Sequence, residues 1–244
     1  LISILSFAYI LVIKGIIMNT KKLLNWTFLA GMLLVNALSG TAVAASAAAK
    51  SCSLFENGKI EKSVLATLLN AAKNGHMYRV QSSTSQIRFC VDSKIKNVEG
   101  RFKDVRGGIA LNQKQADSEQ AVIVINTKSL ETGSSLVKNV IKGEDFFNVE
   151  KYPEILFVST GVEWTSPTKA VLKGKLTLHG VTKSVYFDVE LTGAGGKSAS
   201  NEENIMVRAT TTIKRSDYGM DNFSGVVNDT VKLCMSVKAK KYSA

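Results

Sequence analysis

The feature that most constrains the fold is an alternation of apolar and polar residues after residue 78. In Ile87 to Asp92, three apolar side chains alternate with Arg, Cys and Asp. Because successive side chains of a β-strand point to opposite faces, this period of two predicts strands with one buried face. Similar segments lie at 98–102, 108–111, 121–125, 155–159, 170–178, 185–191, 205–213 and 230–237. Turn residues separate them, so we expect an all-β domain of eight to nine strands, closed as a barrel or stacked as a sandwich.

Two shorter segments have the spacing of a helix. Between residues 59 and 74 the apolar residues follow one helical stripe, and Asn74-Gly75 ends it as a helix C-terminus often ends. We expect this helix to pack on the strands that follow. Residues 136–147 have the same kind of spacing and finish in Phe146 and Phe147, which predicts a short helix across one mouth of a barrel.

The first 44 residues predict export. From Met18, two lysines precede an apolar stretch at 23–38, and Ala42-Val43-Ala44 supplies the small residues of a cleavage site. We therefore expect residues 1–44 to be upstream sequence plus a signal peptide, with Met18 as the true start, and the protein to be periplasmic or secreted. A genuine N-terminal anchor is the alternative. Residues 45–77 would form an arm and helix, and residues 78–244 the β domain.

The charge balance favours some partners over others. Without residues 1–44 the chain keeps 28 basic and 20 acidic residues, a net charge of +8. Export argues against nucleic acid, and an anionic membrane surface or a phosphorylated lipid is the more natural partner. Scattered lysines that only maintain solubility are the alternative.

Candidate catalytic groups are few. The two histidines are His76, beside a turn, and His179, where a strand enters a turn. No Ser or Cys is paired with either in a recognisable motif, and three scattered cysteines make no metal-ligand spacing. We therefore expect a protein that is not an enzyme and carries no cofactor.

Five segments, in order, resemble the motifs of the YceI-like family. They are Ile87-Arg88-Phe89 with 98–102 (VEGRF), 129–133 (SLETG), 143–155 (GEDFFNVEKYPEI), 174–183 (GKLTLHGVTK), and 215–220 (RSDYGM) with 227–231 (VNDTV). The resemblance implies an eight-stranded, lipocalin-like antiparallel barrel. It also implies that a polyisoprenoid or similar long-chain amphiphile, such as a quinone, prenyl phosphate or fatty amide, binds in the lumen. A homodimer is a further implication. Many members carry a histidine after the first strand, where this chain has Asp92-Ser93.

The inward parity of such a barrel defines the candidate site. We expect the lumen to be lined by Phe89, Val91, Phe102, Ile109, Leu111, Val122, Val124, Phe157, Leu176, Leu178, Phe187, Val189, Val207 and Ile213, with Phe146 at the mouth. Polar contacts to a head group are expected from Arg215, Asp217, Tyr218 and either Lys138 or Lys142. The alternative is that the apolar residues fill a solid core and that the protein acts through its surface. The small inward residues Gly174 and Ala209 favour a cavity.

The cysteines suggest a disulfide. Cys90 lies in the first long strand and Cys234 in the last, and barrel closure makes these strands neighbours. Both have outward parity, in a compartment expected to be oxidising, so a Cys90–Cys234 bridge is the first hypothesis. Pairing of Cys52 with either one is the alternative.

Overall fold

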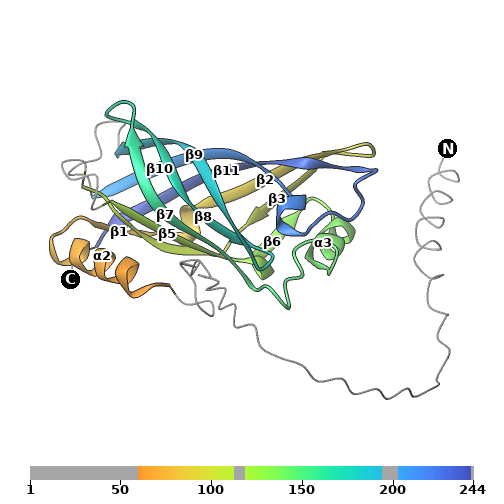
Figure 1. Cartoon of the computed structure of the whole chain (residues 1–244), viewed down its shortest axis with the longest axis horizontal. Coiled ribbons are helices and arrows are strands. Elements are labelled where there is room, and N and C mark those ends of the chain that lie inside the picture. The colour runs from red at the N-terminus through yellow and green to blue at the C-terminus, as the bar shows by residue number, and fades with distance from the viewer. Residues whose placement is uncertain (1–59, 113–118, 194–202, 243–244) are drawn as a thin grey trace, which may run out of the picture. The chain divides into compact units, whose positions relative to one another are not determined.

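The computed structural model describes residues 60–112, 119–193 and 203–242, shown in colour in Figure 1. The predicted leader, the start of the arm and Cys52 lie outside these residues. Eight strands form a closed antiparallel ring in the order β1, β4, β5, β7, β8, β9, β10, β11, and β11 pairs back to β1. The predicted eight-stranded barrel is therefore confirmed. The ring strands are β1 (Met77–Val80), β4 (Val105–Ala110), β5 (Gln120–Asn126), β7 (Glu154–Trp164), β8 (Lys169–Leu178), β9 (Val181–Gly193), β10 (Asn204–Lys214) and β11 (Val227–Lys241).

Three more strands extend the sheet beside β11. They are β2 (Gln86–Ser93), β3 (Val98–Phe102) and β6 (Leu130–Thr132), which follow β11 in that order. Since β11 pairs with β2 along Val227–Ser236 and with β1 along Ala239–Lys241, β1 and β2 follow one another along the same edge. A 3-10 turn at Ser82–Thr84 separates the two strands.

Two serine hydroxyls bond to backbone groups of the connection between β3 and β4. One is Ser82, in the turn between β1 and β2, and the other is Ser129. Ser82 Oγ accepts a hydrogen bond from the Val105 N–H at 3.1 Å and donates to the Lys103 carbonyl at 3.2 Å. Ser129 Oγ accepts from the N–H groups of Lys103 and Asp104, at 3.2 and 3.0 Å. Because unpaired backbone polar groups are costly when removed from water, these hydroxyls allow neighbouring strands to bend together.

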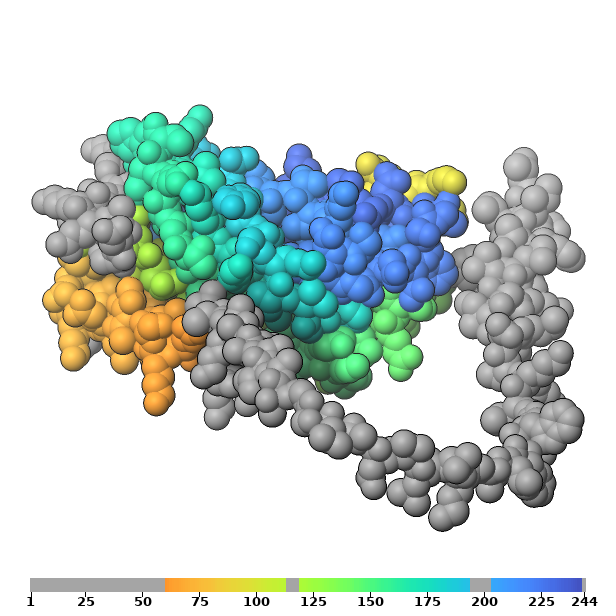
Figure 2. All heavy atoms as spheres, in the orientation of Figure 1, coloured from red at the N-terminus to blue at the C-terminus, as the bar shows by residue number. Residues whose placement is uncertain are grey.

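Helix α2 (Lys62–Lys73) covers the outer face of the barrel. Its Val64, Leu68 and Ala71 are buried against Ala110, Val122 and Val158 of β4, β5 and β7, and Figure 2 shows it, in orange, against the strands. The prediction that this helix packs on the following strands is confirmed. Within the residues that the structure describes, neither α2 nor α3 is long and apolar enough to cross a bilayer.

The position of α2 corrects the predicted parity of β5. Val122 points outward under the helix, whereas Ile123 and Ile125 belong to the interior cluster. Val124 pairs with Leu156 on the same outward face. The segment 121–125 is apolar throughout because both faces of β5 are covered, and alternation therefore carries no information there.

Helix α3 (Ser135–Lys142) lies at the other end of the barrel, beside β6 (Figure 1). The Ser134 side chain caps it by accepting a hydrogen bond from the Val137 N–H. The helix was predicted to continue to Phe147, but it ends at Lys142, and Gly143 follows in an extended conformation. Phe146 and Phe147 consequently lie in the connection to β7.

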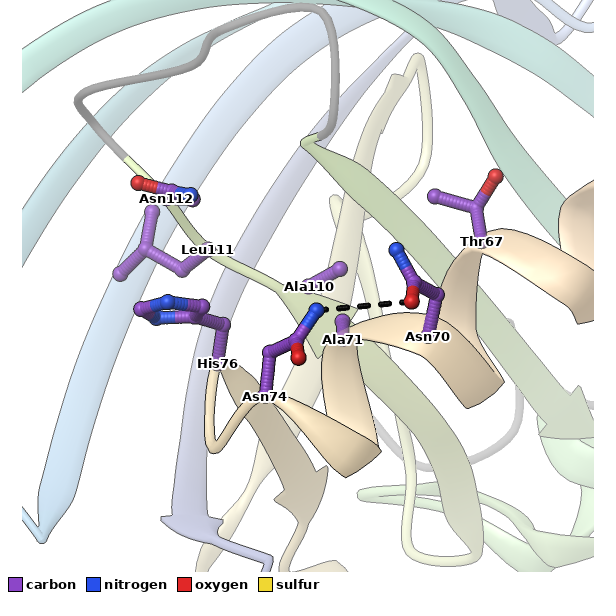
Figure 3. Close-up of a pocket in the computed structure, with 8 residues that line it drawn as sticks. All are labelled: Thr67, Asn70, Ala71, Asn74, His76, Ala110, Leu111 and Asn112. Atoms are coloured by element: carbon purple, nitrogen blue, oxygen red, sulfur yellow. Dashed lines mark hydrogen bonds between the residues drawn. The ribbon is translucent and has the colours of Figure 1, made fainter.

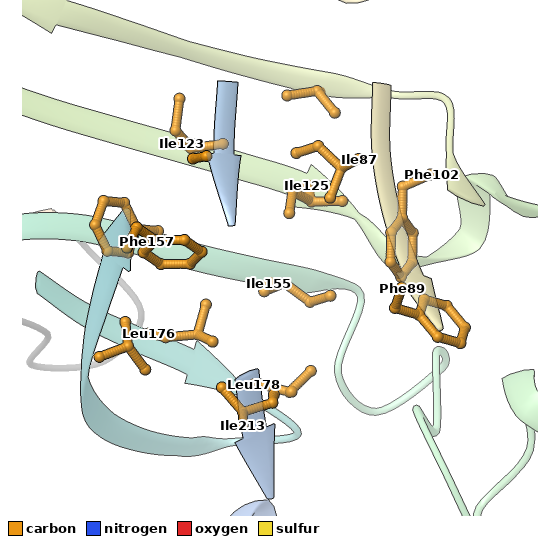
Figure 4. Close-up of a cluster of buried hydrophobic side chains, with 14 of the residues drawn as sticks. Ile87, Phe89, Phe102, Ile123, Ile125, Ile155, Phe157, Leu176, Leu178 and Ile213 are labelled. Atoms are coloured by element: carbon orange, nitrogen blue, oxygen red, sulfur yellow. The ribbon is translucent and has the colours of Figure 1, made fainter. Parts of the chain in front are cut away.

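Aromatic rings fill the interior wall over two glycines. A Cβ atom placed on Gly100 would lie 2.3 Å from the Phe89 ring, and one on Gly174 would lie 2.4 Å from the Phe157 ring. Both rings contribute to the buried cluster drawn in Figure 4. Gly174 therefore accommodates Phe157 and does not itself open a cavity.

We predict that Gly174→Ala destabilises the fold. The added methyl group would also meet the Val158 carbonyl oxygen at 2.6 Å, a backbone atom that cannot rotate away. We expect a loss of roughly 1–3 kcal/mol in the free energy of unfolding, measured by urea denaturation. Gly161→Ala on β7 is the control, since a Cβ there meets nothing within 4 Å. Equal effects of the two substitutions would contradict this packing.

Candidate functional site

Most of the predicted lining residues do lie inside the barrel. Phe89, Phe102, Phe157, Leu176, Leu178, Phe187 and Ile213 are buried in one interior cluster. Val91 is also buried, opposite Val98 and Val231. Leu111 belongs to a second interior cluster with Tyr78, Leu191 and Ile205, against which Ile109 packs. Whether these side chains contact a ligand stays a prediction.

One part of the interior wall keeps accessible apolar surface. Several side chains of β8 to β11 share the inward parity of buried neighbours and pack against them, yet are only partly buried. They are Leu172, Val189, Val207, Val231, Leu233 and Met235. Their register partners on the same face include Phe187 and Ala209, which are buried. This strip can therefore contact an apolar molecule without first unpacking the core.

The end of the barrel near α3 is closed by aromatic side chains. The Phe147 ring packs on Phe89 and Phe102 with centroid separations of 5.6 and 5.5 Å. Phe146, the predicted mouth residue, packs partly on the interior cluster and stacks on Phe223 at 5.8 Å. The neighbouring Asn222 amide donates a hydrogen bond to Asp145 at 2.8 Å. The α3–β7 connection and the loop before β11 therefore hold each other over this end.

Arg215 does not occupy the predicted head-group position. Its side chain is buried and donates to backbone carbonyls: Nε to Asn228 at 3.0 Å, Nη2 to Val227 at 3.0 Å, and Nη1 to Asn222 at 2.7 Å and also to Met220. Because these bonds use all three guanidinium nitrogens, Arg215 holds the loop between η5 (Ser216–Tyr218) and β11. The predicted ligand contact is corrected to a structural one.

The other predicted head-group residues, Asp217 and Tyr218, differ in burial. Asp217 is exposed, whereas Tyr218 is buried in the interior cluster. Tyr218 Oη has no hydrogen-bond partner among the described residues. Burial raises the pKa of this phenol to about 12, with a smaller contribution from the Asp217 charge. Of the two predicted lysines, Lys142 donates to the Lys128 carbonyl at 2.6 Å. Tyr218 is thus the predicted polar residue that remains available inside the barrel.

His179 lies beside this tyrosine. Its Nδ1 is 3.0 Å from the Tyr218 carbonyl oxygen, and its ring packs edge-on against Tyr152 with centroids 4.5 Å apart. The residue has a positive φ of 52°, as a turn next to Gly180 requires. Its role here is to connect the β8–β9 turn to η5.

Glu119 is an interior polar residue that the sequence analysis missed. It is buried at 7% exposure just before β5, and its Oε2 accepts a hydrogen bond from the indole Nε1 of Trp164 at 2.8 Å. Burial raises the pKa of this carboxyl group, against the smaller effects of the bonds from Trp164 and from the Asn112 backbone. The alternation of 121, 123 and 125, continued backwards, gives Glu119 the inward parity and could have identified it.

The predicted Cys90–Cys234 disulfide is not formed. Within the described residues both thiols are free and partly buried, and the alternative pairings with Cys52 lie outside those residues. They lie on the neighbouring strands β2 and β11, as expected, but the register pairs Cys90 with Lys232 and Cys234 with Arg88. The two thiols are therefore on diagonal neighbours. Such residues are usually about 7–8 Å apart, with a somewhat shorter Cβ–Cβ distance, whereas a disulfide requires Cβ atoms about 3.8 Å apart.

A small cavity lies outside the barrel, between α2 and the end of β4 (Figure 3). Its volume is about 60 Å³, and its lining includes Asn70, Asn74, His76 and Leu111. Sites for drug-sized molecules enclose about 300–1,000 Å³, so this cavity is too small for a lipid. Among the described residues, no three or more His, Cys, Asp or Glu side chains are grouped as metal ligands.

Comparisons with known proteins agree with this fold. The model of the YceI-like domain matches residues 78–239. A UPF0312 protein of Pseudomonas putida is 35% identical over 156 residues, which cover 62% of this chain and 80% of that protein. The YceI protein of Campylobacter jejuni superposes with a TM-score of 0.54 at 28% identity, covering 61% of this chain and 87% of that one. A polyisoprenoid binding domain from Saccharophagus degradans has a TM-score of 0.51 at 20% identity, covering 67% and 98%, and shows a shared fold.

We predict that Arg215→Met destabilises the protein in the absence of any lipid. The substitution leaves several carbonyl groups of the loop without donors, which should lower the free energy of unfolding by roughly 2–4 kcal/mol. Chemical denaturation measures this loss, and Lys214→Met, which replaces an exposed neighbour, is the matched control. If Arg215→Met has the same free energy of unfolding as the unsubstituted protein, Arg215 would again be a candidate contact for a lipid head group.

A second prediction concerns alkaline stability. The folded pKa of Tyr218 is raised from its ordinary value near 10 to about 12. The neutral phenol therefore stabilises the folded state fully below pH 10. As the pH rises through 12 this contribution is lost, which lowers the free energy of unfolding by up to roughly 2–3 kcal/mol. Urea unfolding at pH 8 and at pH 11.5 should show this component in the unsubstituted protein and not in Tyr218→Phe. The same decrease in both proteins would refute the assignment.

Proposed function

The chain belongs to the YceI-like family, and on that premise we propose that it binds a long-chain lipid, such as a polyisoprenoid, inside its barrel. The observation that carries this proposal is the accessible apolar strip on the inward side of β8 to β11. A surface of this kind binds through burial, at about 0.8 kcal/mol per methylene group, so a long chain needs few polar contacts. The Saccharophagus degradans domain, named for polyisoprenoid binding, supports the same ligand class.

The proposed mechanism is sequestration and needs no bond-making step. An apolar chain would lie along Val207, Leu233 and Met235, with its far end near the Phe147 plug. Of the polar residues predicted from the sequence, Tyr218 keeps a buried hydroxyl that has no hydrogen-bond partner among the described residues. Export through the predicted leader would place this activity in the periplasm or outside the cell. A quinone, a prenyl phosphate and a fatty amide are candidate ligands, and docking on a membrane surface and a homodimer belong to the same proposal.

A barrel without a ligand is the second candidate function. The packing of Phe157 over Gly174 favours it, because this ring takes the space that a small inward residue was expected to leave. Such a protein would act through its outer surface.

Purification from the native compartment, followed by organic extraction and mass spectrometry, distinguishes the two. We expect one lipid species in stoichiometric amount. A protein that is purified empty and takes up no prenyl or fatty lipid when offered it would support the second candidate.

We further predict that Val207→Phe weakens lipid binding. The ring would project from β10 into the accessible strip and displace about two methylene groups of the ligand. At about 0.8 kcal/mol each, this corresponds to a roughly tenfold higher Kd, measured with a fluorescent fatty or prenyl probe. Thr210→Phe, on the exposed face of the same strand, should leave the Kd unchanged. Equal Kd values for both variants would place the ligand elsewhere.

A further inference from the structure

We propose that Glu119 and Trp164 form the polar end of the binding site and select a lipid head group that donates a hydrogen bond and carries no negative charge, such as an alcohol, amide or amine. This inference rests on the proposed function and adds the chemistry and orientation of the ligand. It begins from the buried side-chain atoms that have no hydrogen-bond partner among the described residues. These are Tyr218 Oη with its neighbour His179 Nε2, and Glu119 Oε1.

The two groups lie at opposite ends of the barrel. Tyr218 is in η5, near the aromatic plug formed by Phe147 and its neighbours. Glu119 precedes β5 at the end where α2 packs, and its partner Trp164 belongs to the cluster of Leu191 and Ile205. Because the plug closes the first end, the second end is the better position for a head group, with the apolar tail directed toward the plug.

Side chains take the place of backbone pairing around Glu119. The last backbone pair between β5 and β7 is Val122 with Val158. Beyond it, Ser159 Oγ accepts a hydrogen bond from the Ala121 N–H at 2.8 Å, and the Gln120 amide donates to the same hydroxyl at 3.0 Å. Trp164 Nε1 then reaches Glu119 across the same two strands. The carboxyl group is therefore held in a fixed position, with one oxygen bonded and the other without a partner in the part of the chain that the structure describes.

The free oxygen sets the chemistry of the ligand. Glu119 is 93% buried, yet no salt bridge to it is present among the described residues. A second negative charge, such as a phosphate, would be strongly unfavourable beside a carboxylate in an apolar surrounding. A hydroxyl, amide or ammonium group would instead donate to Oε1 and supply the bond that this atom lacks. The raised pKa of the carboxyl group agrees with a charge that the protein itself does not compensate.

The test compares three lipids with one tail. Farnesol, farnesylamine and farnesyl phosphate are titrated into the mature protein, and each Kd is measured by displacement of a fluorescent fatty probe. We expect the alcohol and the amine to bind at least tenfold more tightly than the phosphate. In Glu119→Gln, which retains an acceptor for Trp164, the advantage over the phosphate should fall at least fivefold. Glu163→Gln, in the exposed acid next to Trp164, should leave the ranking unchanged.

The possible outcomes separate this inference from the proposed function. Binding of all three lipids with equal Kd values, or a preference for the phosphate, overturns the inference and leaves lipid binding intact. An advantage over the phosphate that is as large in Glu119→Gln as in the unsubstituted protein also overturns it. If none of the lipids binds, the proposed function fails and this inference fails with it. Trp164→Phe, which removes the indole donor, provides a second variant if Glu119→Gln does not fold, and it should also reduce the selectivity.

Discussion

Strand β11 pairs with β10 along one edge and with β2 and then β1 along the other, and barrel closure rests on this second edge. A strand of 15 residues is long enough to serve both partners. The price is a break between β1 and β2, where the two Ser85–Lys238 hydrogen bonds keep the chain attached to β11. Closure gives every inward side chain a common interior, and only then do Phe89 from β2 and Phe157 from β7 contribute to one cluster.

The inside of this barrel is not uniform. Near α3 it is packed with aromatic rings, along β8 to β11 its wall keeps accessible aliphatic surface, and near α2 it contains a buried carboxyl group. A ligand bound along this axis would meet rings, then aliphatic side chains, then a hydrogen-bond acceptor. That order suits an amphiphile with one polar end better than a symmetrical apolar molecule.

The sequence predicted the fold well because alternation records burial wherever only one face of a strand is covered. It placed Phe89, Leu176 and Phe187 correctly for this reason. It failed at Val122, since α2 buries the second face of β5. It also failed at Arg215, because the sequence does not distinguish an arginine that binds backbone carbonyls from one that binds an anionic ligand. Glu119 has the inward parity of 121, 123 and 125, but it stands outside the apolar run, and its bond to Trp164 emerges only from the pairing of β5 and β7.

Helix α2 has a consequence for where the folded unit begins. The family domain starts at residue 78, after the helix, yet Ala110, Val122 and Val158 on the outer wall are buried only because Val64, Leu68 and Ala71 cover them. A chain cut at residue 78 would lose only Met77 from the strands and would still expose an apolar patch on the outside of the sheet. Such a patch promotes self-association. In this protein the family match begins after the helix that covers the outer apolar surface of the barrel, so the two boundaries are different positions in the chain.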